Sequence, residues 1–160
     1  MSSVGKVPGC VLCNAVASGP ERDEENLVLH RARRNYVIIN KYPYSNGHLM
    51  IAPFEHVADL GSASGAQLDE MMQLAQACET ILGKAYGPDG FNIGMNIGRA
   101  AGAGVIEHHH LHIVPRWIGD ASFMSATADT RVIPETPGGT FARLRPLFEA
   151  HFAASPPEQG

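Results

Sequence analysis

The segment His108-His109-His110-Leu111-His112-Ile113-Val114 decides how this chain is interpreted, because four of its eight histidines stand within five positions. Side chains alternate between the two faces of a β-strand, so His108, His110 and His112 would line one face and the residues between them the other. A row of three imidazoles is a poor way to build an apolar core. The run is internal and ends in an apolar strand, which argues against an affinity tag. The remaining non-functional explanation is a surface strand that happens to be rich in histidine.

Two kinds of chemistry use histidines with this spacing. One is a metal site, in which His-x-His on a strand supplies two zinc ligands and a third ligand follows. The other is nucleophilic catalysis, in which a neutral imidazole nitrogen attacks phosphorus and forms a phosphoramidate. The nucleophile then needs an acceptor that keeps the proton on its second ring nitrogen, and a neighbouring histidine can protonate the leaving oxygen.

The segment that precedes the histidines favours phosphate chemistry. Residues 94–104, GMNIGRAAGAG, are rich in glycine and alanine. Such small residues let backbone N–H groups approach an anion closely, as they do in phosphate-binding nests. A glycine-rich connection that merely turns is the alternative. Next to the histidines, this segment is a candidate phosphate cradle.

Hydrophobic periodicity around the histidines predicts an α+β fold. Strand-like runs occupy residues 27–30, 36–40, 48–52, 91–97 and 110–114. Ser64 and Gln67 fit a capping box at the start of a long helix, in which apolar residues recur at helical spacing as far as Leu82. A shorter helix starts near Thr140 and buries Phe141, Leu144, Leu147, Phe148 and Phe152. We therefore expect an antiparallel sheet of about five strands with one long and one shorter helix.

Length and composition limit the possible functions. The chain has 160 residues, 44% of them apolar and 18% charged, which predicts one globular domain over residues 1–153 and a disordered tail at 154–160. The net charge of −4 gives no reason to expect a nucleic-acid polymer or a membrane as a partner. No apolar run approaches the roughly 20 residues that a membrane span needs.

Two cysteines near the start of the chain, Cys10 and Cys13, form a C-x-x-C pair. Residues 1–8 lack the apolar core of a secretory signal, so we expect a cytoplasmic location. In a reducing compartment, such a pair favours metal binding or redox chemistry over a structural disulfide.

These motifs resemble the histidine triad (HIT) superfamily, whose signature is His-x-His-x-His followed by two apolar residues. Residues 108–114 fit that signature. Residues 40–53 are similar to the segment that leads to the family's pocket histidine, and residues 101–107 are similar to its phosphate loop. The extension 114–124 is similar to the branch of bacterial diadenosine tetraphosphate phosphorylases and related hydrolases. The resemblance covers about residues 10–125 and implies a HIT-like fold.

The resemblance implies a nucleotidyl hydrolase or transferase. Such an enzyme cleaves the α-phosphate linkage of a dinucleoside polyphosphate, such as diadenosine tetraphosphate, or of a nucleoside phosphoramidate. His110 would attack the α-phosphorus and carry a covalent nucleotidyl group, which water or inorganic phosphate then releases. His112 would bond the phosphate and assist the leaving group, and His108 would orient the site. Positioned donors would stabilise the phosphoryl charge, so no catalytic metal is required.

The resemblance also implies which residues bind the substrate. The α-phosphate would be held by Asn96, Gly102 and Gly104. Asn40 and His48 would contact the ribose and line the base pocket. The chain departs from the family at His109, where most members are apolar, and at Gly104, where many members carry a serine or threonine hydroxyl.

In the zinc-containing members that the chain resembles, the C-x-x-C cysteines join two histidines. Here the four ligands would be Cys10, Cys13, His56 and His108, which form a closed structural Cys2His2 site. The alternative is a pair of buried reduced cysteines without a metal. Family members commonly form homodimers, and the apolar content of the long helix fits such pairing.

Two other functions remain open on the residues alone. A zinc-dependent hydrolase would use His108, His110 and His112 as ligands around an activated water. A nucleotide-binding protein without catalytic activity would have the same fold and would bind the nucleotide without cleaving it.

Overall fold

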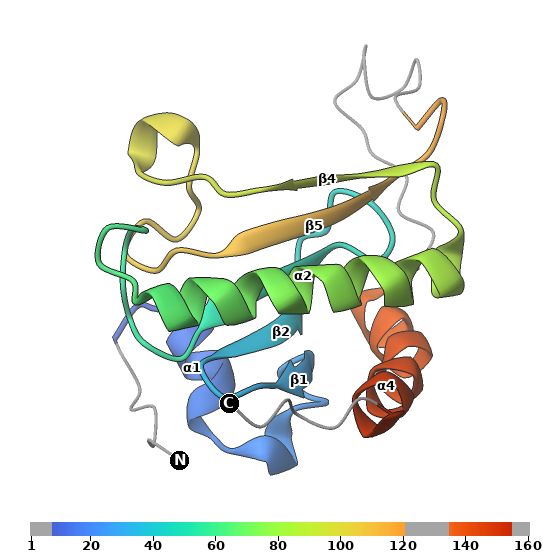
Figure 1. Cartoon of the computed structure of the whole chain (residues 1–160), viewed down its shortest axis with the longest axis horizontal. Helices are drawn as coiled ribbons and strands as arrows, with labels where there is room; N and C mark the ends of the chain where they lie inside the picture. The colour runs from blue at the N-terminus through green and yellow to red at the C-terminus, as the bar shows by residue number, and fades with distance from the viewer. Residues whose placement is uncertain (1–7, 121–134, 155–160) are drawn as a thin grey trace.

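Five strands form one antiparallel sheet in the order β1-β2-β3-β5-β4 (Figure 1). The computed structural model describes residues 8–120 and 135–154. The strands are β1 (Val28–Arg31), β2 (Asn35–Ile39), β3 (Leu49–Pro53), β4 (Gly90–Gly94) and β5 (Leu111–Arg116). All five predicted strands are present, although β4 ends at residue 94 rather than 97 and β5 begins at 111 rather than 110.

The predicted long and shorter helices are α2 (Gly65–Tyr86) and α4 (Pro137–Ala154). A third helix, α1 (Val11–Ala17), follows the first cysteine of the C-x-x-C pair and was not predicted. Its seven residues are too few for helical periodicity to stand out in the sequence. Two short 3-10 turns, η1 (Pro20–Arg22) and η2 (Arg99–Ala101), complete the described elements.

Helix α2 begins where the sequence indicates. The Ser64 side chain accepts a hydrogen bond from the Gln67 backbone N–H, as an N-cap residue does. Only this half of the capping box forms: the Gln67 side-chain NH2 donates to Oδ1 of Asn35, 2.9 Å away, and its Oε1 accepts no hydrogen bond from the described residues. The helix ends at Gly87, whose left-handed backbone (φ 55°) suits a residue without a Cβ atom.

Two hydrophobic clusters cover the two faces of the sheet, because consecutive strand residues point to opposite sides. Val37 and Ile39 of β2 pack with α2 and α4, which lie across one face (Figure 1). Tyr36 and Ile38 of the same strand pack with α1 on the other face. Helix α4 begins three residues before Thr140 and buries most of the predicted side chains, with two of them only partly buried. Its buried aromatic and aliphatic residues are Phe141, Leu144 and Phe148, and the partly buried ones are Leu147 and Phe152.

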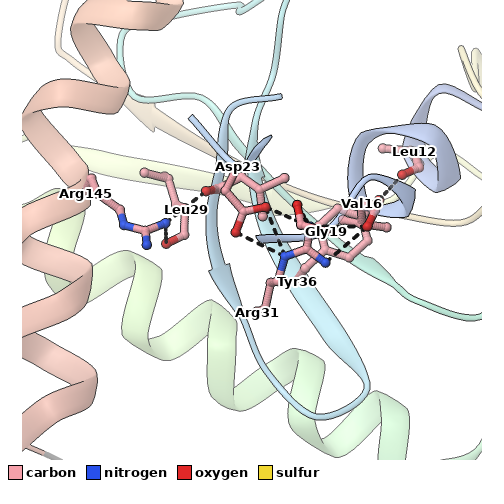
Figure 2. Close-up of polar contacts among 9 residues, drawn as sticks. Leu12, Val16, Gly19, Asp23, Leu29, Arg31, Tyr36 and Arg145 are labelled. Atoms are coloured by element: carbon pink, nitrogen blue, oxygen red, sulfur yellow. Dashed lines mark hydrogen bonds and ion pairs between the residues drawn. The ribbon is translucent and has the colours of Figure 1, made fainter. Parts of the chain in front are cut away.

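A buried polar network fixes α1 to the sheet (Figure 2). Arg31 donates from Nε to both carboxylate oxygens of Asp23 and from its terminal nitrogens to the backbone oxygens of Val16 and Gly19. The Tyr36 hydroxyl donates to the Leu12 carbonyl at 2.8 Å. An arginine at the carbonyl end of a helix also complements the helix dipole. The two cysteines are therefore held on a firmly attached element.

Within residues 8–120 and 135–154, no helix combines the length and apolarity needed to cross a bilayer. Of the tail predicted at 154–160, Ala154 is the last residue of α4, and residues 155–160 lie outside the described part of the chain. The end of the motif at 114–124 likewise lies outside it, from residue 121 onward.

Candidate active site and metal centre

The alternation predicted for the histidine segment holds, although the strand itself starts only at Leu111. Leu111 and Ile113 pack against the α2 side of the sheet, so His112 between them faces the opposite side. His110 lies on that side too, with its ring centroid 4.9 Å from that of His112. His109 points the other way, and its Nε2 lies 3.3 Å from the Gln67 amide of α2.

The three alternating histidines divide into two neighbouring sites. His108 turns its ring toward the cysteines of the C-x-x-C pair, at 3.4 Å from both sulfur atoms. His110 and His112 form an edge-to-face pair. Their shared chain segment therefore joins a cluster of metal-ligand type directly to the His110–His112 ring pair.

The protonation of His110 follows from its hydrogen bond. Its Nδ1 atom lies 2.9 Å from the backbone oxygen of His108. A carbonyl oxygen only accepts, so Nδ1 carries the proton and the lone pair of the neutral ring stands on Nε2. His110 is 5% exposed. An imidazole that attacks through Nε2 requires this tautomer.

A second chain of hydrogen bonds fixes His112. The Tyr44 backbone N–H donates to Nδ1 of His48 at 3.0 Å, so the proton of a neutral His48 stands on Nε2. That Nε2 lies 2.9 Å from Nδ1 of His112. His112 therefore accepts on Nδ1 and carries its own proton on Nε2. Burial, and then the nearby His110, lower the pKa of His112 to about 4, which keeps the ring neutral at neutral pH.

The structure places His48 differently from a pocket-lining residue. It has no exposed surface and contacts His112 in the way just described. Strand register explains this, because Met50 of β3 pairs with His112, and His48 lies two residues before Met50 on the same side. The half-buried Asn40 lies beside it, with Nδ2 3.4 Å from His48 Nδ1, and its Oδ1 accepts from the Tyr42 N–H.

The glycine-rich connection lies at the same end of the sheet. Gly94 pairs with His112 in the β4–β5 ladder, so the half-buried Asn96 follows just beyond that pair. The Gly102 N–H donates to the Arg99 carbonyl at 3.1 Å, and its φ of 80° favours glycine. The backbone N–H of Gly102, which was predicted to hold phosphate, thus donates a hydrogen bond within the turn. Gly104 is exposed, and a Cβ atom there would meet nothing within 4 Å.

The four predicted metal ligands come together. The ligand atoms of Cys10, Cys13, His56 and His108 all lie within 4.8 Å of one another. Three of the sulfur–nitrogen distances are 3.3–3.4 Å, close to the about 3.6 Å that separates sulfur and nitrogen ligands around tetrahedral zinc. The donors therefore fit a small tetrahedral cation.

The surroundings of this cluster also suit a metal. The His108 Nε2–H donates to the Pro53 carbonyl at 2.9 Å, which directs the lone pair of Nδ1 at the sulfurs. Burial, and then the adjacent Cys10, raise the pKa of the Cys13 thiol to about 12. Without a cation the Cys13 thiol is therefore protonated, whereas zinc binds the thiolate form.

Sequence reasoning missed three groups that organise these sites. They are the backbone oxygens of Pro53 and Val57 and the backbone N–H of Tyr44. Main-chain groups carry no residue-type signal, so only the fold reveals them.

Comparison with known proteins gives a consistent result. The family profile described as the HIT domain matches residues 21–117. An AP-4-A phosphorylase of Mycobacterium tuberculosis is 40% identical over 113 residues, covering 71% of this chain but 58% of that protein. An adenosine 5'-monophosphoramidase of Schizosaccharomyces pombe is 27% identical over 107 residues, which cover 67% of this chain and 74% of that protein.

Among solved structures, a zinc-bound histidine triad family protein from Mycobacterium smegmatis superimposes with a TM-score of 0.71. It is 26% identical, and the match covers 92% of this chain and 98% of that one. The sheet order, the intact histidine segment and the family match all indicate the same family. The chain belongs to the HIT domain family.

Proposed function

We propose that this protein cleaves the α-phosphate linkage of a dinucleoside polyphosphate of the diadenosine tetraphosphate type, or of a nucleoside phosphoramidate, through a nucleotidyl group on His110. The observation that carries the proposal is the bond from His110 Nδ1 to the His108 carbonyl, because it leaves Nε2 as the free nucleophile. The names of the phosphorylase and phosphoramidase relatives support the substrate class.

In the first step, Nε2 of His110 attacks the α-phosphorus. The new P–N bond forms as the bond from phosphorus to the bridging oxygen or nitrogen breaks, and the electron pair leaves with the second product. The ring keeps its Nδ1 proton and becomes cationic, and the His108 carbonyl stabilises that charge. Water or inorganic phosphate then attacks the same phosphorus, and the P–N bond breaks with its electron pair returning to Nε2, which leaves His110 neutral; when water attacks, one of its protons is released to solvent.

His112 assists at the leaving side. Its Nε2–H, fixed by the hydrogen bond from His48, donates to a phosphoryl oxygen or to the leaving oxygen or nitrogen while charge develops there. We assign Asn96 and Gly104 to the α-phosphate and Asn40 to the ribose. We assign Gly102 to the shape of the loop, because its N–H already has a partner, and His48 to the orientation of His112.

The Cys2His2 cluster would hold a structural zinc ion. All four coordination positions would be filled by Cys10, Cys13, His56 and His108, so the ion would stabilise the fold rather than bind substrate. This arrangement also argues against a hydrolytic zinc on the triad. The His108 ring faces the cysteines, and the Nδ1 atoms of His110 and His112 are used by a carbonyl and by His48.

We further propose a cytoplasmic homodimer. Strand β4 lies at the edge of the sheet, and its Ile93 is 41% exposed. On α2, Met72 is 60% exposed. Apolar side chains exposed on an open strand edge and on a helix are natural surfaces for pairing with a second copy. Three buried reduced cysteines, Cys10, Cys13 and Cys78, fit a reducing compartment.

A panel of nucleotides tests the proposal. Products from diadenosine polyphosphates of different lengths and from adenosine phosphoramidate are identified by mass spectrometry, with and without inorganic phosphate and in ¹⁸O-water. We expect a nucleoside monophosphate that carries ¹⁸O when water is the acceptor, or a nucleoside diphosphate when phosphate is. Turnover of all substrates below about 10⁻³ s⁻¹, against about 1–10³ s⁻¹ for typical enzymes, would favour a non-catalytic binding protein.

A further inference from the structure

One peptide group, between His108 and His109, is held at both of its ends. Its carbonyl oxygen accepts the Nδ1–H of His110 at 2.9 Å. Its N–H, which belongs to His109, donates to the Val57 carbonyl at 2.8 Å. The orientation of the group that fixes the nucleophile is therefore set by a contact to the loop after β3.

The side chain of His109 also donates a hydrogen bond to the Val57 carbonyl oxygen. Its Nδ1 lies 3.1 Å from the Val57 oxygen, so the ring donates there with the proton on Nδ1. Its Nε2 then accepts from the Gln67 amide at 3.3 Å. His109 is buried, and the Gln67 amide is also tied to Asn35. The backbone N–H and the ring N–H of His109 thus both donate to the Val57 carbonyl oxygen.

We infer that His109 is a positioning residue for the nucleophile: its ring holds the Val57 carbonyl against the 108–109 peptide and thereby fixes the Nδ1–H tautomer and the direction of the His110 ring. The catalytic consequence rests on the proposed function, whereas the effect on the tautomer does not. An apolar side chain at this position would fill the space but would leave the Val57 carbonyl with only the backbone donor.

Three substitutions separate this role from simple packing. His109→Asn keeps an N–H at about the reach of Nδ1, so it can still donate to Val57. His109→Gln places its amide near the former Nε2, toward Gln67, and loses the Val57 contact. His109→Leu loses both contacts. The matched control is His30→Leu, which removes a half-buried histidine of β1 whose ring stacks on Phe152, 3.7 Å away.

The first measurement is the tautomer of His110, from ¹⁵N–¹H correlation NMR of its ring in the full-length protein. We expect a single Nδ1–H form in the unmodified protein, in His109→Asn and in His30→Leu. We expect a mixture of tautomers in His109→Gln and His109→Leu. An unchanged single tautomer in folded His109→Gln and His109→Leu would overturn the inference, and this measurement decides it even if the protein has no activity on nucleotides.

The second measurement is the single-turnover rate of nucleotidyl transfer to His110. We expect His109→Gln and His109→Leu to lower this rate by about 100-fold, the loss that a misplacement of about 1 Å causes, with KM nearly unchanged. His109→Asn should recover most of the rate. Equal loss in the Asn, Gln and Leu variants would also overturn the inference, because packing alone would then explain it. Absence of any adduct in the unmodified protein would instead refute the proposed function.

Discussion

His48 Nε2 lies 2.9 Å from His112 Nδ1, and the Tyr44 N–H occupies the other ring nitrogen of His48. This arrangement allows His112 to be neutral and still offer a proton on Nε2. His48 is completely buried, so in the proposed mechanism it influences the substrate through His112.

Replacing His48 with phenylalanine tests this relationship. His48→Phe keeps the volume but removes the donor, so Nε2 of His112 no longer carries a fixed proton. We expect kcat to fall by about 100-fold, the lower end of the about 10²–10³-fold cost of losing one positioned donor to developing charge. Steady-state kinetics on a dinucleoside polyphosphate measures the change, with His30→Phe as the control. A kcat within twofold of the unmodified protein would show that the hydrogen bond is irrelevant to catalysis.

The metal cluster predicts a separate effect on stability. Cys13→Ser, or removal of metal with a chelator, should reduce bound zinc from about one ion per chain to a trace, by elemental analysis. Because structural zinc contributes several kcal/mol and about 2–4 °C is lost per kcal/mol in a chain of this length, we expect the melting temperature to fall by about 10 °C or more.

Cys78 provides the comparison for this metal experiment. It is buried in α2, away from the four ligands, so Cys78→Ser should lower the melting temperature while zinc content stays the same. Equal zinc content in Cys13→Ser and Cys78→Ser would contradict the assignment of the ligands.

Most of the sheet could be predicted from the sequence, whereas the partners of the site residues could not. Alternation predicted over residues 108–112 put His109 on the side opposite His110 and His112, and the contacts of these rings agree although β5 begins only at Leu111. The pairing of Met50 with His112 depends on strand register, which no local pattern fixes. His48 was therefore expected to line the pocket, and its contact with His112 emerged only from the fold.

The predicted metal ligands and α1 show the same difference between what the sequence predicts and what only the fold reveals. The family resemblance was enough to select four residues whose potential ligand atoms meet in space. The helix that carries the cysteines was missed, because α1 owes its position to tertiary contacts. Arg31 and the Tyr36 hydroxyl donate hydrogen bonds to backbone oxygens of α1. Neither contact produces a periodic pattern in the sequence.

The Arg31–Asp23 pair should matter far more than an exposed pair. Their side chains are only 15% and 8% exposed, whereas those of Arg22 and Glu25 are 53% and 63% exposed. Arg31→Met leaves the Asp23 carboxylate buried without its partner, at a cost of about 3–5 kcal/mol. Arg22→Met should cost about 0–1 kcal/mol. Urea denaturation measures both, and similar losses in the two variants would contradict this description of α1.

Stability should also fall on acidification. Burial, and then the charge of Arg145, lower the pKa of His30 to about 4 from its ordinary value of 6.5. Between these two values the unfolded chain binds more protons than the folded one, so the free energy of unfolding decreases as the pH falls from about 6.5 to 4. Urea denaturation at several pH values should show a shallower decrease for His30→Leu. An identical slope in both proteins would mean that His30 does not titrate as described.

The central claim is that His110 becomes covalently bonded to phosphorus. Its most direct test is peptide mapping by mass spectrometry of a reaction quenched within the first turnover, under neutral conditions that preserve the P–N bond. We expect a nucleoside monophosphate group on His110, and none in His110→Ala, which should still bind nucleotide. Turnover without any adduct, or an adduct on His112 instead, would contradict this account.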